Sequence, residues 1–198
     1  MIKAIFFDLG NVILKEGYQP GIRYYEKKYA IPKGELYQAA HGHQHWKNFT
    51  LGLISEQEYL TQVDRHFSGD LDTTILNQAI YDHIELVSGV LDFICQLKGF
   101  YILGLISNYP KELFEWCEKR FGFEDLFTVR AISGLVHIRK PDLKIFRYAL
   151  NQARVKPSEV IYVDDREDRV GPARSLGINV IVFTLVASLK TDIDKLIK

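Results

Sequence analysis

Four short stretches of the chain are almost continuously apolar, and a fifth is weaker. β-Branched and aromatic residues dominate them, which is typical of strands that are buried on both faces of a sheet. The four stretches cover residues 2–7, 100–106, 159–163 and 179–183, and the weaker one covers residues 127–132. The pattern therefore predicts a sheet that lies in the interior of the protein.

Between these stretches, apolar residues recur at helical spacing. Residues 110–121, 142–153 and 165–177 have this pattern, and Gly177 fits a C-terminal helix cap. Strands that alternate with helices form parallel sheets through right-handed crossovers. We therefore predict an α/β fold, with a Rossmann-like parallel sheet and helices on both faces.

Residues 17–85 interrupt this alternation with helical patterns and no convincing strand. Ser55 and Glu58 have capping-box spacing, which predicts a helix start. Glycines and a serine mark the junctions, at Gly17, Gly21 and Ser88–Gly89. We predict an α/β core domain of residues 1–16 and 86–198 and a helical cap domain of residues 17–85. An insert after the first strand would stand over the carboxyl edge of the sheet, where open α/β folds bind ligands.

Charge and composition narrow the choice of partners. Lys+Arg and Asp+Glu each number 25, so the net charge is zero and neither nucleic acid nor an anionic membrane is favoured as a partner. The longest apolar runs fall short of the roughly 18–20 residues that span a bilayer. The two cysteines form no metal-binding spacing and no disulfide framework, which predicts a reducing, cytoplasmic location.

Polar side chains follow the ends of the predicted strands. Asp8 follows the first stretch, Ser107 and Asn108 follow the second, and Asp164 and Asp165 follow the third. The carboxyl ends of parallel strands lie at one edge of a sheet, so we expect these groups to converge. A basic residue before a predicted helix is a further candidate, Lys140.

Three converging carboxylates would repel one another and raise each other's pKa values. A divalent cation relieves that repulsion, and an all-oxygen set at a phosphate site favours Mg²⁺. Phosphoryl transfer needs a nucleophile, a metal, a hydroxyl donor and a fixed positive charge. Asp8, Ser107 and Lys140 supply the protein's share of these parts.

This order of motifs resembles the haloacid dehalogenase-like hydrolase superfamily, in its capped phosphatase branch with a D-L-G-N-V first motif. The resemblance covers nearly the whole chain, including the helical insert. Four motifs carry it, FFDLGNV (6–12), LISN (105–108), RKPD (139–142) and IYVDD (161–165).

The resemblance implies a role for each matching residue. Asp8 would be the nucleophile that forms an aspartyl-phosphate, which water then hydrolyses. Ser107 and the backbone at Asn108 would hold the phosphoryl oxygens, and Lys140 would neutralise them. Mg²⁺ would be bound by the side chains of Asp8 and Asp165 and by a backbone carbonyl, that of Gly10, with support from Asp164.

Two positions depart from the family pattern. Arg169 stands where the family often has Asp or Asn, and the adjacent Asp168 points about 100° away on a helix. Gly10 stands where most phosphatases of the family carry an aspartate that acts as general acid. A water on the metal, a donor from the cap or an easily released substrate could replace that acid. On this basis we expect a preference for aryl or acyl phosphates over alkyl phosphates.

The cap carries a histidine-rich stretch, HGHQHW (41–46). On one continuous helix only His41 and His45 would share a face, while His43 would point elsewhere. A metal site, a face toward substrate and a polar cap surface all remain open. Other cap aromatics are expected to form the core of the cap, namely Tyr24, Tyr25, Tyr37, Phe49 and Tyr59.

The function that we predict is hydrolysis of a small phosphorylated metabolite, with a sugar phosphate as the leading candidate, by a Mg²⁺-dependent phosphatase. Two rivals remain. A metal-free haloacid dehalogenase also uses an aspartate nucleophile, but it gains nothing from the carboxylate pair at 164–165. A catalytically silent binding module that retains the fold is supported by Gly10 and Arg169.

Overall fold

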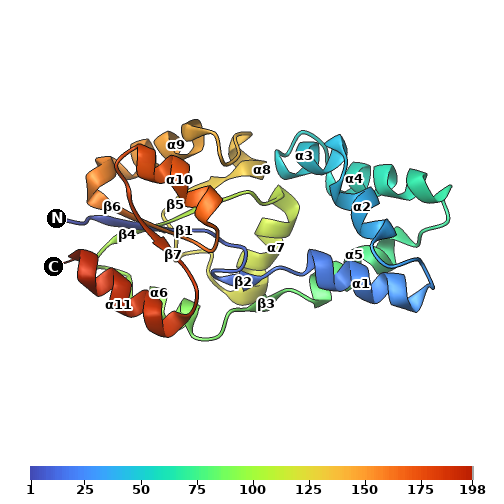
Figure 1. Ribbon diagram of the computed structural model, residues 1–198, viewed down its shortest axis with the longest axis horizontal. Helices are drawn as coiled ribbons and strands as arrows, with labels where there is room; N and C mark the ends of the chain where they lie inside the picture. The colour runs from blue at the N-terminus through green and yellow to red at the C-terminus, as the bar shows by residue number, and fades with distance from the viewer. Residues whose placement is uncertain (198) are drawn as a thin grey trace.

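The computed structural model describes residues 1–197. Within them, five parallel strands form one sheet in the order β5–β4–β1–β6–β7 (Figure 1). The strands are β1 (Ala4–Phe7), β4 (Ile102–Ser107), β5 (Val129–Ile132), β6 (Val160–Asp164) and β7 (Asn179–Val182). All five coincide with the stretches that the sequence predicts, except that β4 and β6 each run one residue further, to Ser107 and Asp164, so the predicted α/β fold is confirmed.

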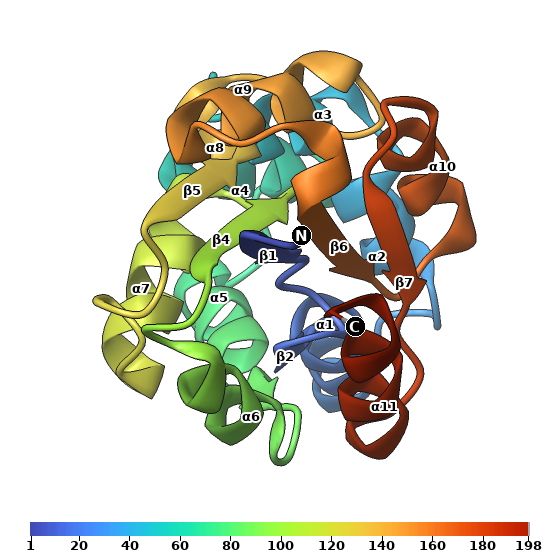
Figure 2. The ribbon, with the colours of Figure 1, turned by 90° about the vertical axis from the view of Figure 1, so that its left-hand side faces the viewer.

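Helices cover both faces of this sheet (Figure 2). Along β1, Ala4 and Phe6 belong to one buried apolar cluster while Ile5 and Phe7 belong to the other, as alternation along a strand requires. The first cluster is covered by α9 (Leu143–Ala153) and α10 (Glu167–Ser175), and the second by α6 (Val90–Leu97), α7 (Lys111–Phe121) and α11 (Val186–Ile197). Two short helical turns complete the core: α8 (Ser133–Val136) follows β5, and η2 (Pro157–Glu159) precedes β6.

The segment after β1 is helical and lies beyond the carboxyl ends of the strands (Figure 1). Its elements are α1 (Tyr18–Lys28), α2 (Glu35–His41), α3 (Gln44–Thr50), α4 (Glu56–Asp64), η1 (Arg65–Phe67) and α5 (Thr73–Asp82). The predicted capping box is present at the start of α4. The Ser55 hydroxyl accepts from the Glu58 N–H at 3.2 Å, and the Glu58 carboxylate accepts from the Ser55 N–H at 2.7 Å.

The histidine-rich stretch is not one helix. Helix α2 ends with Gly42 as its C-cap, and His43 has an extended backbone (φ −121°, ψ 164°) before α3 begins. His41 and His45 therefore belong to different helices, and the expectation that they share a helix face is wrong. The extended residue interrupts the i to i−4 hydrogen bonds on which that face depends.

The chain leaves and re-enters the core through two short strands that pair with each other. They are β2 (Leu14–Lys15) and β3 (Glu85–Leu86), which run antiparallel. Gly17 is the N-cap of α1, whereas Gly21 lies inside α1, where an added Cβ would be 2.5 Å from the Ala79 carbonyl oxygen. Gly21 thus serves the close packing of α1 on α5 and does not mark the junction. The division into a core and a cap domain at residues 17–85 stays a prediction.

No helix within residues 1–197 combines the length and the apolar character that crossing a membrane requires.

Candidate active site

Three carboxylates meet where the two central strands end. Asp8 follows β1, Asp164 ends the neighbouring strand β6, and Asp165 comes next. One oxygen atom from each lies within 4.8 Å of the others, and among residues 1–197 this is the one such group of acidic, histidine or cysteine side chains. Parallel pairing of β1 with β6 brings together residues that are more than 150 positions apart in sequence.

Lys140 joins two of these carboxylates. Its ammonium group lies 2.9 Å from the Asp8 carboxylate and 2.6 Å from the Asp164 carboxylate, and it donates to the Tyr162 hydroxyl at 2.8 Å. The side chain is 1% exposed. A buried lysine so fully committed to polar partners is held at a defined position, with its charge directed at the nucleophile candidate.

Asn108 fixes the loop that carries Lys140. The Lys140 backbone N–H donates to the Asn108 side-chain oxygen at 2.7 Å, and the Asn108 amide donates to the Lys140 carbonyl at 3.0 Å. This reciprocal pair uses the Asn108 side chain for positioning. Its neighbour Ser107 ends β4, is buried, and lines the same pocket as Asp8.

Asn11, from the turn after β1, donates to the Asp165 carboxylate at 3.2 Å. This contact orients Asp165, although Arg169 replaces the family's usual Asp or Asn. Asp168 takes no part, since it is exposed and pairs with Arg166 at 2.9 Å. Asn11, a residue of the first motif, thus gives Asp165 a hydrogen bond that the Arg169 position does not provide.

The carboxylates have the chemistry of a magnesium site. Burial raises the pKa of Asp8 above its ordinary value, with a further contribution from Asp164 that Lys140 opposes. Burial and then the charge of Asp164 likewise raise the pKa of Asp165. A divalent cation would relieve this repulsion, and an all-oxygen donor set suits Mg²⁺. The residues present therefore fit the predicted metal.

The side chain of Glu16 packs against Gly10. No motif or spacing in the sequence predicts that Glu16 belongs to the site. A Cβ atom built on Gly10 would lie 2.3 Å from Oε1 of Glu16. The side-chain space of position 10 is thus filled by another residue of the same pocket.

A pocket of about 190 Å³ joins these groups to the helical segment. The predicted catalytic, phosphate-binding and metal-binding residues all line it, namely Asp8, Gly10, Ser107, Asn108, Lys140 and Asp165, whereas the supporting Asp164 does not. The sequence reasoning missed Asn11, Glu16, Arg139 and Arg166. Arg139 belongs to the motif RKPD, so the sequence could have indicated it as a second cation beside Lys140.

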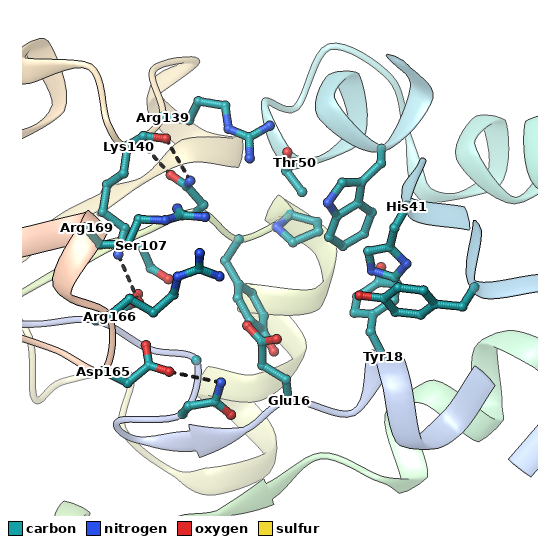
Figure 3. Close-up of a pocket in the computed structure, with 18 residues that line it drawn as sticks. Glu16, Tyr18, His41, Thr50, Ser107, Arg139, Lys140, Asp165, Arg166 and Arg169 are labelled. Atoms are coloured by element: carbon teal, nitrogen blue, oxygen red, sulfur yellow. Dashed lines mark hydrogen bonds and ion pairs between the residues drawn. The ribbon is translucent and has the colours of Figure 1, made fainter. Parts of the chain in front are cut away.

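The wall opposite the strand ends is aromatic (Figure 3). Tyr37 stacks on His41 with ring centroids 4.3 Å apart, and Trp46 lies 4.2 Å from the same ring. Tyr18 meets Trp46 edge to face at 4.6 Å, and all four line the pocket. Tyr37 therefore faces the site and is not only part of the cap core.

The other two histidines of the stretch lie elsewhere. His43 stacks on His66 with centroids 4.4 Å apart, and His45 bonds the Ala39 carbonyl at 2.7 Å. Of the three possibilities left open for HGHQHW, His41 takes the face toward the pocket, and no metal-binding group includes these residues within 1–197.

Burial in the aromatic wall lowers the pKa of His41 to about 4. The unfolded chain binds a proton near pH 6.5, so folding excludes that proton and stability falls as the pH drops from 6.5 toward 4. We expect the stability difference between wild type and His41→Phe to change by about 2 kcal/mol between pH 7.5 and pH 5, in favour of the variant. Urea unfolding at both pH values measures this, and a difference that does not change with pH would contradict it.

Comparison with known proteins identifies the family of this chain. A family model for haloacid dehalogenase-like hydrolases matches residues 2–177. The drimenol cyclase drtB of Aspergillus calidoustus is 28% identical over 92% of this chain, which spans 34% of that protein. A D-ribitol-5-phosphate phosphatase of Bacteroides thetaiotaomicron is 25% identical, and the match covers 89% of each chain.

Among solved structures, the wild-type HAD family enzyme bt-2542 of Bacteroides thetaiotaomicron superposes with a TM-score of 0.81 at 22% identity, covering 93% of this chain and 95% of that one. That enzyme was solved in complex with magnesium and inorganic phosphate. The fold and the match over residues 2–177 establish the class of protein. This chain is a member of the haloacid dehalogenase-like hydrolase family.

Proposed function

We propose that this protein is a Mg²⁺-dependent phosphatase that hydrolyses a small phosphorylated metabolite through an aspartyl-phosphate on Asp8. The observation that carries the proposal is the meeting of the three carboxylates with buried Lys140 in one pocket. The pocket lining also holds three arginines, so its cations outnumber its carboxylates. A site with this surplus favours an anionic substrate.

In this mechanism, the Asp8 carboxylate attacks phosphorus and the bond to the leaving oxygen breaks. Ser107 and the backbone at Asn108 hold the phosphoryl oxygens, and Lys140 neutralises the charge on them. Lys140 is already in contact with the nucleophile, so no rearrangement is needed when charge develops. Water then attacks the phosphorus, which returns Asp8 to its carboxylate form and releases phosphate.

Asp8, Asp165 and the backbone carbonyl of Gly10 would hold the Mg²⁺, which would supply positive charge to stabilise the negative charge of the phosphoryl group. Asp164 helps to hold Lys140 in place beside these ligands, because its carboxylate accepts hydrogen bonds from both Lys140 and the Tyr162 hydroxyl. Asn11 keeps Asp165 oriented.

The substrate that we favour is a sugar or sugar-alcohol phosphate. The pocket of about 190 Å³ suits a small molecule, and an aromatic wall can pack against the C–H faces of a carbohydrate. The relative from Bacteroides thetaiotaomicron carries the name of a phosphatase of this substrate class. Both considerations support the choice of class and leave the individual compound to experiment.

A substrate panel tests the proposal against its two rivals. We expect 4-nitrophenyl phosphate and at least one sugar phosphate to be hydrolysed with Mg²⁺, and activity to disappear with EDTA. A 2-haloacid should not be turned over. Release of halide that survives EDTA would instead identify a dehalogenase, and a panel without any turnover would favour the silent binding module.

Removing a proposed metal ligand should change the Mg²⁺ requirement. We expect Asp165→Ala to raise the Mg²⁺ concentration for half-maximal activity by at least about 10-fold, as loss of ligands or their partners does in other metal sites. Titration of activity against Mg²⁺ measures it. Asp168→Ala is the matched control, because Asp168 is exposed and outside the carboxylate group. An unchanged titration for Asp165→Ala would show that the metal is held elsewhere.

A further inference from the structure

The turn after β1 brings Glu16 back over Gly10. The Asn11 N–H donates to the Leu14 carbonyl at 2.6 Å, and Leu14 also forms a bridge with Gly10. Two residues beyond this bridge, the Glu16 carboxyl reaches the space in which a side chain at position 10 would begin. The Glu16 carboxyl therefore lies over the backbone of Gly10, the second residue after Asp8.

The basic side chains that line the pocket form no ion pair with Glu16 within residues 1–197. Lys140 pairs with Asp8 and Asp164, and Arg166 pairs with Asp168. Within residues 1–197, no basic side chain forms an ion pair with Glu16. Glu16 stands just before α1, but no side chain caps that helix start. A carboxyl group that lines the pocket without a structural ion pair is available for chemistry on the substrate.

We propose that Glu16 is the catalytic proton donor that replaces the acid missing at position 10. This inference rests on the proposed phosphatase function. As the Asp8 oxygen forms its bond to phosphorus, the bond to the ester oxygen breaks and that oxygen takes the proton of the Glu16 carboxyl. The products of this step are the free alcohol, the aspartyl-phosphate and the Glu16 carboxylate.

The second step returns the proton. The Glu16 carboxylate takes a proton from the water that attacks phosphorus, and the bond between phosphorus and the Asp8 oxygen breaks. Inorganic phosphate leaves, and Asp8 is again a carboxylate while Glu16 is again protonated. Atoms and charge balance over the two steps, and one group serves as acid and then as base.

The geometry also links positions 10 and 16. A Cβ atom at position 10 would lie 2.3 Å from Oε1 of Glu16, so a side chain there would have to displace the Glu16 carboxyl from this space. Gly10 and Glu16 thus form one arrangement in which the donor comes from the segment leading into the helical insert. An enzyme with this donor needs no activated ester, which opposes the preference that we expected from Gly10 alone.

The test compares Glu16→Gln with wild type on two esters, 4-nitrophenyl phosphate and the primary alkyl phosphate that wild type hydrolyses fastest. A nitrophenolate leaves without a proton, whereas an alkoxide does not. We expect kcat/KM for the alkyl ester to fall about 10²–10³-fold and that for the aryl ester to fall less than about 5-fold. With the aryl ester, the variant should show a burst of nitrophenol because the second step lacks its base.

Two further variants complete the design. Glu85→Gln is the control, since Glu85 is exposed, pairs with Lys15 and lies outside the pocket. In Glu16→Ala the space over Gly10 is emptied, so Gly10→Asp added to it should recover alkyl phosphatase activity at least about 10-fold. Gly10→Asp alone should not improve on wild type, because the two side chains compete for one space.

The outcomes separate the inference from the proposed function. If wild type hydrolyses both esters and Glu16→Gln slows them equally or not at all, Glu16 is not the donor and the phosphatase proposal stands. If wild type hydrolyses only the aryl ester, the site lacks an acid and this inference is also overturned. If wild type hydrolyses neither, the proposed function itself fails.

Discussion

Replacing Asp8 with asparagine is expected to reduce phosphatase activity below about 1% of wild type while the protein stays folded, because the change removes the nucleophile. The asparagine side chain has nearly the same shape. Lys140 keeps a carboxylate partner, since Asp164 lies 2.6 Å from its ammonium group. Steady-state kinetics with 4-nitrophenyl phosphate and circular dichroism measure the two parts of this expectation.

Asp125→Asn is the matched control, because the same change is then made on an exposed aspartate outside the active-site pocket. It should keep wild-type activity. A covalent phosphoryl group should be trapped on wild type after acid quenching and be absent from Asp8→Asn. A folded Asp8→Asn protein with more than about 1% of wild-type activity would contradict covalent catalysis by this residue.

Replacing Lys140 with methionine is expected to damage both stability and activity. Methionine fills much of the same space but leaves two buried carboxylates, Asp8 and Asp164, without their cation. Loss of one partner of a buried ion pair typically costs about 3–5 kcal/mol. Loss of a preorganised positive charge at the phosphoryl group should lower kcat/KM by at least about 10²-fold. Urea unfolding and steady-state kinetics measure these effects.

A double variant separates the two effects of Lys140. In Lys140→Met combined with Asp164→Asn, one of the stranded carboxylates becomes neutral, so part of the lost stability should return while activity stays low. Lys144→Met is the control, because Lys144 is exposed on α9. If Lys140→Met is as stable as wild type, the ion pairs with Asp8 and Asp164 are not what holds this part of the site together.

The positions of the candidate catalytic groups were largely predictable from the sequence because they depend on strand order and direction. Continuous apolar runs are a strong signal for buried strands, and parallel strands bring Asp8, Ser107 and Asp165 to one edge whatever the loops do. Lys140 was found only with the help of its motif. Its burial and its contacts with Asp8 and Asp164 could not be read from sequence, since they depend on how the loop before α9 folds.

Helical spacing predicted that residues 17–85 are helical but did not predict the break inside the histidine-rich stretch. The backbone turn at Gly42 and His43 separates α2 from α3, and local periodicity does not record such a turn when apolar residues continue on both sides. The break places His41 against Tyr37 and Trp46 in the pocket wall, which His43 and His45 do not line.

Hydrophobic periodicity and chain direction are enough to specify the sheet, the helical insert and the carboxylates at the strand ends, and all three can be read from the amino-acid order. The groups that support these carboxylates become visible only in the folded chain. Asn11 reaches Asp165, Asn108 holds the Lys140 loop, and Glu16 fills the space over Gly10. Each of these contacts joins residues through tight turns or between separate loops, where a shift of a few ångströms makes or breaks a hydrogen bond and no repeating pattern marks the partner.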